Sequence, residues 1–144
     1  MTKILVADDE ADLETLIRQK FRQKIREQQY EFVFAINGND ALDKMQQHPD
    51  IAIVLSDINM PEMDGLDLVR AVRVQYPDLP VILITGQGSE ALALEALEQG
   101  AASYVPKQKL AEMLSVTLDQ VVGMVRADRS YAMLIECVDR TEFT

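Results

Sequence analysis

Five short apolar runs alternate along the chain with stretches in which apolar residues recur every three or four positions. The predicted strands are residues 3–7, 30–36, 51–55, 81–84 and 103–105. The third run is apolar throughout, which is typical of a strand buried on both faces of a parallel sheet. This alternation predicts an α/β fold with a five-stranded parallel sheet, right-handed crossovers and helices on both faces, in a three-layer doubly wound arrangement.

The stretches between the runs carry helix signals. Apolar spacing over residues 13–25 predicts one helix after the first strand. Asn39 or Asp40 is expected to cap the second helix, and Gly100 to end the fourth. A last helix is expected to begin near Lys109, which completes five strand-helix units.

The length of the chain sets its domain organisation. With 144 residues, 48% of them hydrophobic, it can bury one core but not two. We expect one domain over residues 1–125 and a C-terminal extension over residues 126–144. The extension begins charged and becomes strongly apolar. It could prolong the last helix as a coiled-coil or dimer element, dock on the domain, or lead to a missing output domain. The pattern from Met133 onward also allows an extended strand. We favour an interaction, dimerisation or linker element.

Composition argues against several classes of protein. A formal net charge of −10 repels phosphate backbones, so direct binding of nucleic acid is not expected. Neither a signal peptide nor an apolar run of membrane-spanning length is found, so we expect a cytoplasmic chain without membrane contact. The single cysteine, Cys137, can form neither an internal disulfide nor a cysteine zinc site, which agrees with a reducing compartment.

Polar residues follow four of the five predicted strands: Asp8 and Asp9, Asp57, Thr85 and Lys107. Because ligands gather at the carboxyl ends of parallel strands, these side chains should share one crevice. Three carboxylates repel one another unless a cation joins them, and an oxygen-only set suits Mg²⁺ or Mn²⁺. With such a metal, Asp57 can act as a nucleophile toward phosphorus while Lys107 balances the charge of the phosphoryl oxygens.

Four segments of the sequence resemble the receiver domain of two-component response regulators of the chemotaxis-regulator type, over about residues 2–125. They are KILVADDE, LSDINMPEMDG, ILITG and GAASYVPK. The resemblance implies a flavodoxin-like (βα)5 fold with strand order 2-1-3-4-5. One departure is that Gln108 follows Lys107 and Pro106 precedes it, whereas the family usually has a proline directly after the lysine.

The resemblance also implies residue roles. Asp57 would be the phosphoacceptor, with Pro61 and Gly65 shaping its loop. The expected metal ligands are Asp9 directly, Asp8 through water, Asp57, and the backbone carbonyl of Asn59. Thr85 would bind the phosphoryl group beside the small Gly86, Lys107 would bind phosphate, and Thr85 and Tyr104 would form the switch.

The implied function is a phosphorelay switch rather than an ordinary enzyme, although it catalyses its own phosphorylation and dephosphorylation. The phosphoryl donor would be a histidine kinase or a histidine phosphotransfer protein. Phosphorylation would then change contacts made by the face of the fourth helix, fifth strand and fifth helix. Those contacts would be with a downstream protein, with a missing output domain, or with a second copy in a homodimer.

Two rival functions remain open. A haloacid-dehalogenase-like phosphatase also uses an aspartyl nucleophile, but it needs a second acid two residues later, where this chain has Asn59. A degenerate receiver would serve only as a protein-binding scaffold, although Asp57, Thr85 and Lys107 are all present.

Simpler interpretations exist for single residues. The acids after the first strand can cap a helix, Tyr104 can be a packing residue, and His48 is interpreted as a surface residue without a catalytic role. In the fourth predicted helix, Leu92 would lie near the sheet if Ala96 faces it. Leu94 would then point away, either as a partner contact or as a scattered surface leucine.

Overall fold

Five parallel strands form one sheet, in the order β2-β1-β3-β4-β5, in a computed structural model that describes residues 1–86, 90–110 and 112–124. The strands are β1 (Thr2–Ala7), β2 (Tyr30–Ala35), β3 (Ile51–Asp57), β4 (Val81–Thr85) and β5 (Ser103–Pro106). All four neighbouring pairs are parallel, so β2 and β5 are the two edges. The predicted fold class and strand order are confirmed.

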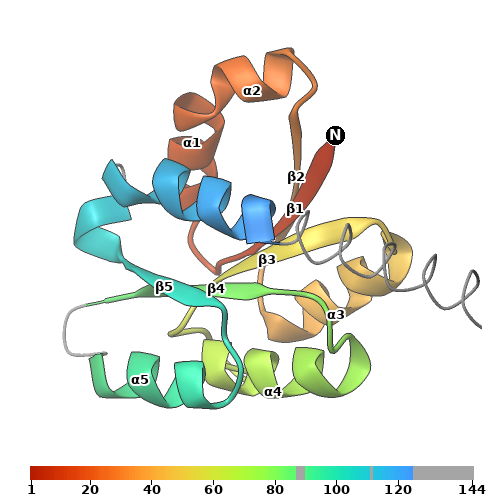
Figure 1. The fold of residues 1–144 in the computed structure, drawn as a ribbon. Helices are drawn as coiled ribbons and strands as arrows, with labels where there is room; N and C mark the ends of the chain where they lie inside the picture. Colours follow the sequence, from red (N-terminus) through yellow and green to blue (C-terminus); the bar gives the residue numbers. More distant parts are fainter. Residues whose placement is uncertain (87–89, 111, 125–144) are drawn as a thin grey trace, which may run out of the picture.

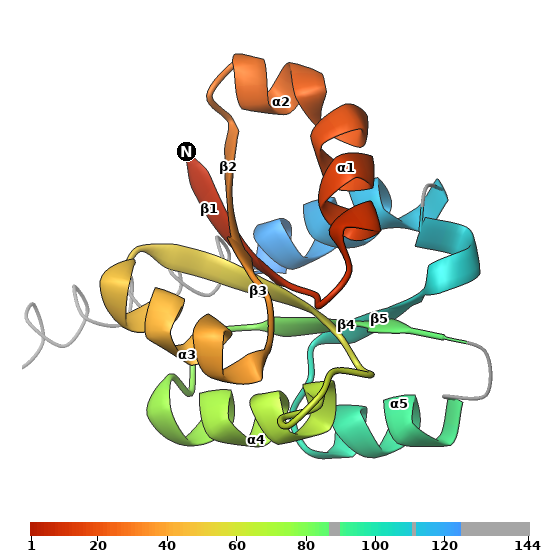
Figure 2. The same ribbon diagram turned by 180° about the vertical axis from the view of Figure 1, so that it is seen from behind.

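Helices cover both faces of the sheet (Figures 1 and 2). Their bounds are α1 (Ala11–Lys20), α2 (Arg22–Arg26), α3 (Gly38–Gln47), α4 (Gly65–Gln75) and α5 (Glu90–Glu98). A 3₁₀ turn at Lys107–Lys109 leads into a last helix, described over residues 112–124 and drawn in blue in Figure 1. This last helix lies with α1 and α2 on one face, and α3, α4 and α5 lie on the other.

Two hydrophobic clusters, one on each face, hold the three layers together. One contains Leu5, Val54 and Leu83 with the inner sides of α3, α4 and α5. The other contains Ile4, Ile53 and Ile82 with α1 and the 112–124 helix. Successive strand residues therefore enter opposite clusters, as the alternating geometry of a strand requires. The wholly apolar central strands are explained by this burial on both faces.

Three local predictions were wrong in detail. The helix predicted over residues 13–25 is divided at Phe21, whose ring packs on Tyr30 and Phe32 of β2 with centroids 5.8 and 5.5 Å away. The cap of α3 is Asn37, whose side chain accepts a hydrogen bond of 2.7 Å from the backbone N–H of Asp40.

The third correction concerns α5, the fourth predicted helix. Ala96 faces the sheet as assumed, but its buried companion is Ala93, and Leu92 is 41% exposed. Residues three apart share a helix face, so the pair at 93 and 96 turns Leu92 outward. Leu94 is 60% exposed, which confirms its outward direction.

The predicted extension at 126–144 and Cys137 lie outside the described residues. Within the part of the chain that is described, no helix is both long and apolar enough to cross a membrane. His48 is half-buried at the end of α3, where its Nδ1 lies 3.5 Å from Nζ of Lys3. That position is near the amino end of β3, at the opposite end of the strands from Asp8, Asp9 and Asp57.

Candidate functional site

The carboxyl ends of the strands meet at the left-hand edge of the sheet in Figure 1. Asp8 and Asp9 directly follow β1, and Asp57 is the last residue of β3. The structure brings these three acids together, with one carboxylate oxygen from each within 4.8 Å of the others. Thr85 ends the neighbouring strand β4, one residue beyond Ile84, which pairs with Asp57.

Asp57 is the most enclosed of the three acids, with 6% of its surface exposed. Its Oδ1 accepts a hydrogen bond of 3.0 Å from the backbone N–H of Asn59. Burial raises the pKa of the Asp57 carboxyl, and repulsion by Asp9 and Glu10 adds to it, whereas the Asn59 N–H and Lys107 oppose the rise. Burial and repulsion prevail, so the negative charge on Asp57 is only partly compensated.

The pKa of the Asp8 carboxyl is shifted in the same direction. Burial raises its pKa to about 6, and the charge of Asp57 contributes to the rise. A hydrogen bond of 2.9 Å from the Glu10 backbone N–H to Asp8 Oδ1 opposes the rise. Two carboxyls with raised pKa values, next to the exposed Asp9, form an oxygen-only set with excess negative charge. This donor chemistry fits a hard divalent cation such as Mg²⁺.

We expect the metal-free chain to be more stable at pH 5 than at pH 7. The pKa of Asp8 is about 6 when folded and has its ordinary value of 3.8 when unfolded, so the folded state binds more protons between these values. The resulting stabilisation is complete below about pH 4 and is lost as the pH rises through 6. Because Asp8 is only half-buried, solvent screening limits the effect to about 1 kcal/mol.

Urea unfolding in the presence of a chelator at both pH values measures this difference. The Asp8→Asn variant should show a smaller difference than the wild type, and added Mg²⁺ should also reduce it. Equal pH dependence in the wild type and in Asp8→Asn would contradict the assignment to Asp8.

Lys107 lies beside the acidic cluster. Its Nζ is 3.5 Å from Glu10 Oε2. Partial burial lowers the pKa of Lys107, but attraction by Asp57, Glu10 and Asp8 outweighs it and raises the pKa overall. Lys107 thus stays protonated and faces the negative cluster. Sequence reasoning considered Glu10 only as a helix cap and missed this ion pair, although its place next to Asp9 was a signal.

Pro106, directly before Lys107, occupies the last position of β5 and pairs with Thr85 of β4. An edge strand tolerates a proline because one of its sides makes no ladder hydrogen bonds. The departure from the family pattern is therefore accommodated within the strand, and Lys107 still reaches the acidic edge. The described residues contain no cis peptide bond.

The loop after Asp57 is held by close backbone contacts. The Ile58 N–H donates to the carbonyl of Ile84, and the Gly65 N–H donates to the carbonyl of Ile58, both at 2.9 Å. A Cβ atom on Gly65 would lie 2.7 Å from Ile58 Cα and 2.8 Å from the Asp57 carbonyl oxygen. Only glycine fits between α4 and this loop, which agrees with the shaping role expected of Gly65.

The remaining predicted residues surround the same edge. Thr85 is buried, and among the described residues a Cβ on Gly86 would meet only Asn59 Nδ2, at 3.9 Å. The side chain of Asn59 is exposed. Tyr104 is 37% exposed on β5, at the surface rather than in the core.

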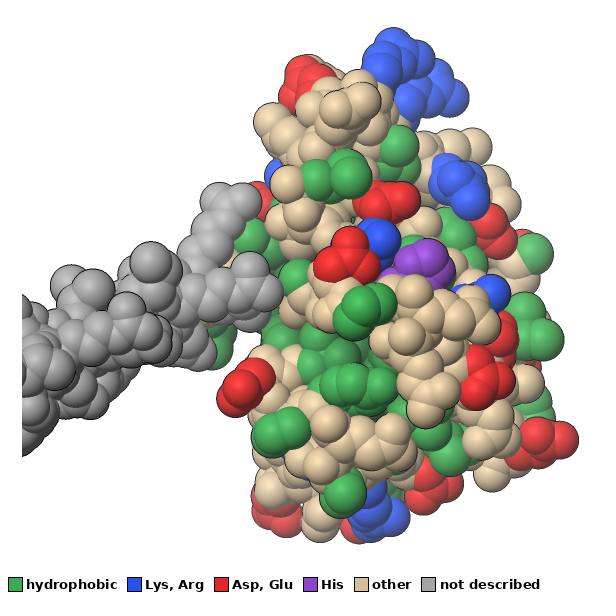
Figure 3. All heavy atoms as spheres, turned by 90° about the vertical axis from the view of Figure 1, so that its right-hand side faces the viewer, with side chains coloured by type: hydrophobic (Ala, Val, Ile, Leu, Met, Phe, Trp, Pro, Cys, Tyr) green, Lys and Arg blue, Asp and Glu red, His purple; other side chains and the backbone are tan. Residues whose placement is uncertain are grey.

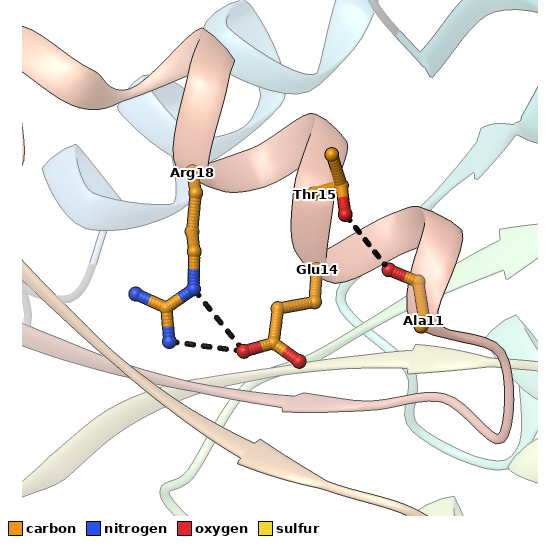
Figure 4. Close-up of polar contacts among 4 residues, drawn as sticks. All are labelled: Ala11, Glu14, Thr15 and Arg18. Carbon is orange, nitrogen blue, oxygen red and sulfur yellow. Dashed lines mark hydrogen bonds and ion pairs between the residues drawn. The ribbon is translucent and has the colours of Figure 1, made fainter.

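Arg18 links α1, the helix that follows the acidic pair, to the sheet. Figure 4 shows Arg18 of α1 directed at Glu14 of the same helix. The Nη2 atom of Arg18 lies 2.9 Å from Oε1 of Glu14. The Arg18 guanidinium also lies 4.7 Å from the centroid of the Phe34 ring on β2. An exposed ion pair adds little stability by itself, but the ring contact joins α1 to β2 beside the acidic loop.

Comparisons with known proteins agree with this geometry. Residues 4–118 match the family model of the response regulator receiver domain. A chemotaxis protein CheY homolog of Campylobacter jejuni is 32% identical over 123 residues, covering 84% of this chain and 92% of the homolog. The response regulator protein FleR of Pseudomonas aeruginosa is 38% identical over 104 residues, covering 72% of this chain but 21% of FleR.

Solved structures show the same likeness. A response regulator receiver domain protein from Clostridium thermocellum superposes with a TM-score of 0.80 at 26% identity, over 88% of this chain and 98% of that protein. Chemotaxis protein CheY4 of Vibrio cholerae gives a TM-score of 0.72 at 31% identity, over 84% and 98% of the two chains.

Proposed function

We propose a function from the premise that this chain belongs to the response regulator receiver domain family, whose members are signalling switches. In this proposal Asp57 accepts a phosphoryl group from a histidine kinase or a histidine phosphotransfer protein. The observation that carries the proposal is the meeting of a nearly buried Asp57 with Asp8, Asp9 and the charge of Lys107 at one sheet edge.

The residues around Asp57 support a metal-assisted transfer. Asp9 and Asp57, the backbone carbonyl of Asn59, and Asp8 through water would hold Mg²⁺. When bound, this ion neutralises carboxylate charge and polarises the phosphoryl oxygens.

A carboxylate oxygen of Asp57 attacks phosphorus in line. An O–P bond forms as the P–N bond of the phosphohistidine breaks, and the bonding electron pair returns to the imidazole. Lys107 then offsets the charge of the phosphoryl group.

The output of the switch is a change in surface contacts. We propose that Thr85 and Tyr104 move toward the phosphoryl group and change the face formed by α5, β5 and the 112–124 helix. These three elements expose large apolar side chains, including Leu94, Tyr104, Met113 and Val116. A shift of a few kcal/mol is enough to convert a domain whose two states are close in free energy.

Relatives of this chain differ in how much of their length lies outside the matched domain. The Campylobacter homolog is covered almost completely by this chain, whereas the match to FleR covers about a fifth of that regulator. Contact with a separate downstream protein, a homodimer and an attached output domain are all compatible with the exposed face.

Replacing Leu94 by glutamate should weaken self-association of the phosphorylated chain without lowering its stability. A buried charge at an apolar contact costs about 2 kcal/mol, which corresponds to a dissociation constant raised by more than tenfold. Light scattering over a concentration series measures the change. The matched control is Val74→Glu, because Val74 is 83% exposed on α4, outside this face. Equal dissociation constants for the wild type and Leu94→Glu would remove Leu94 from the contact.

Asn59 argues against the rival phosphatase. It lies two residues after Asp57, where that class of enzyme needs a second acid, and an amide cannot donate a proton as a carboxylic acid does. A degenerate receiver that serves only as a scaffold would accept no phosphoryl group, so phosphorylation distinguishes it from the proposed switch.

The test is intact-mass spectrometry of the full chain after incubation with Mg²⁺ and acetyl phosphate, a small-molecule phosphodonor. We expect one labile adduct with the mass of a phosphoryl group, absent when a chelator removes the metal. A chain that gains no adduct with Mg²⁺ present would favour the scaffold. An adduct that is independent of metal would contradict the proposed site.

A further inference from the structure

A groove of about 860 Å³ opens at the amino-terminal edge of the sheet, opposite the acidic cluster. Figure 3 faces this edge and shows hydrophobic side chains gathered beside the single histidine, His48. The ends of α3 and α4, the turns leading into β4 and β5, and the 112–124 helix form its lining. Its apolar lining residues include Met45, Tyr76, Leu79, Pro80, Val121 and Met124.

The chain itself passes this groove before it enters residues 125–144. Val121 and Met124 belong to the lining, and Met124 is the last described residue. Residues 125–130 can span roughly 20 Å when extended. The segment that follows carries the apolar side chains of Tyr131, Met133, Leu134, Ile135, Val138 and Phe143. A strongly apolar segment therefore begins within reach of an apolar groove.

The groove also contains unpaired donors. Arg73 donates from Nη1 to the carbonyl of Pro77 at 3.0 Å. Its Nε and Nη2 are buried and find no hydrogen-bond partner among the described residues. Burial lowers the pKa of Arg73, and the charge of Asp78 opposes this only in part. Buried guanidinium N–H groups normally have acceptors, and carboxylates are the strongest of them.

The same apolar segment brings such acceptors. Glu136 and Asp139 lie within it, on either side of Val138. A small movement of the Arg73 side chain into the groove would let one of these carboxylates pair with it. Apolar side chains with interspersed acids thus match a groove that is apolar with an unsatisfied arginine.

We propose that this groove is the docking site for residues 131–143 of the same chain. The C-terminal segment then covers the edge of the sheet remote from Asp57 and joins the ends of α3 and α4 to the last helix. Covalent continuity favours this occupant over a second copy, because an attached segment is present at high effective concentration.

Cys137 allows a direct test in the full chain, because it is the only cysteine and lies in the segment. A nitroxide attached to Cys137 should remove most of the amide NMR signal of Met45, Gly100 and Ala102, which line the groove. Signals of Asp9 and Ile58, at the other edge, should persist. Groove signals that stay at full intensity would overturn the proposal.

A mixing control separates the chain's own segment from that of a second copy. Isotope-labelled chain without nitroxide is mixed with unlabelled chain that carries it. Groove signals that remain intact in this mixture support docking within one chain, whereas their loss would show docking between copies and overturn the proposal.

A label-free measurement guards against disturbance by the nitroxide. Ala102→Trp fills the groove and should shift the amide signals of residues 131–143 in the unmodified full chain. The matched control is Ala91→Trp, because Ala91 is an exposed alanine of α5 outside the groove. Segment signals that move equally, or not at all, in the two variants would also overturn the proposal.

Discussion

With asparagine in place of Asp57, incubation with Mg²⁺ and acetyl phosphate is expected to leave the mass of the chain unchanged. An amide oxygen is a far weaker nucleophile than a carboxylate oxygen, and the substitution also removes one charge from the metal site. The adduct expected of the wild type should be lost completely, because no other acid in the described cluster is as enclosed as Asp57.

The same substitution should raise the thermal midpoint of the metal-free chain at pH 7. Burial, together with repulsion by Asp9 and Glu10, raises the pKa of Asp57, so the ionised carboxylate destabilises the fold at neutral pH. If Asp57→Asn is more stable than the wild type and still gains no adduct, misfolding is excluded as the reason for the lost phosphorylation. Thermal unfolding and intact-mass measurements on one sample provide both readouts.

Asp43→Asn is the matched control for charge. Asp43 is exposed on α3 and lies outside the acidic cluster, so its replacement should leave the adduct intact. If Asp57→Asn still gained the adduct at the yield of the control, the phosphoryl group would be on another residue and the assignment of Asp57 would be wrong.

Replacing Gly65 by alanine should destabilise the chain by about 3 kcal/mol. Its new Cβ would meet Ile58 Cα and the Asp57 carbonyl oxygen below 3.0 Å, and both are backbone atoms that cannot turn aside. Because those atoms belong to the loop that follows the phosphoacceptor, slower adduct formation should accompany the lost stability. Urea unfolding gives the free energy, and an unchanged slope would show that only stability has changed.

Gly123→Ala provides the opposite expectation from the same chemical change. A Cβ on Gly123 would meet no atom of the described residues within 4 Å, and the residue lies in the 112–124 helix. Alanine there should raise stability by roughly 0.5–1 kcal/mol, since it restricts the unfolded chain and favours the helix. If both variants changed stability alike, the close packing around Gly65 would not be the cause.

The layer order and the acidic edge could be predicted because they depend on coarse patterns. The continuously apolar β3 implied burial on both faces, and this in turn implied parallel strands whose carboxyl ends share one edge. Asp57 at the end of β3 and Lys107 after β5 were therefore placed together without any contact being known. Their chemical roles were inferred from their charge and position together with the family resemblance, and the mass measurement tests them.

Finer features depend on information that a local pattern does not carry. Asn37, Asn39 and Asp40 are all residue types that can cap α3. The chain begins its first helical turn directly after Asn37, so this residue is the cap. Neighbouring side chains on a helix point about 100° apart. Placing Leu92 instead of Ala93 toward the sheet was therefore enough to misplace a side chain. The groove was not foreseen, since its lining comes from four separate segments of the chain.

The edge strand β5 restricts how this protein can bind its partners. β5 has four residues and ends in Pro106, which lacks an N–H group, so little backbone is available for an incoming strand to pair with. Addition of a foreign strand, whether by a peptide or by an aggregating copy, is therefore discouraged. Recognition on this side must depend on side chains, which allows partner choice to change by substitution while the sheet remains intact.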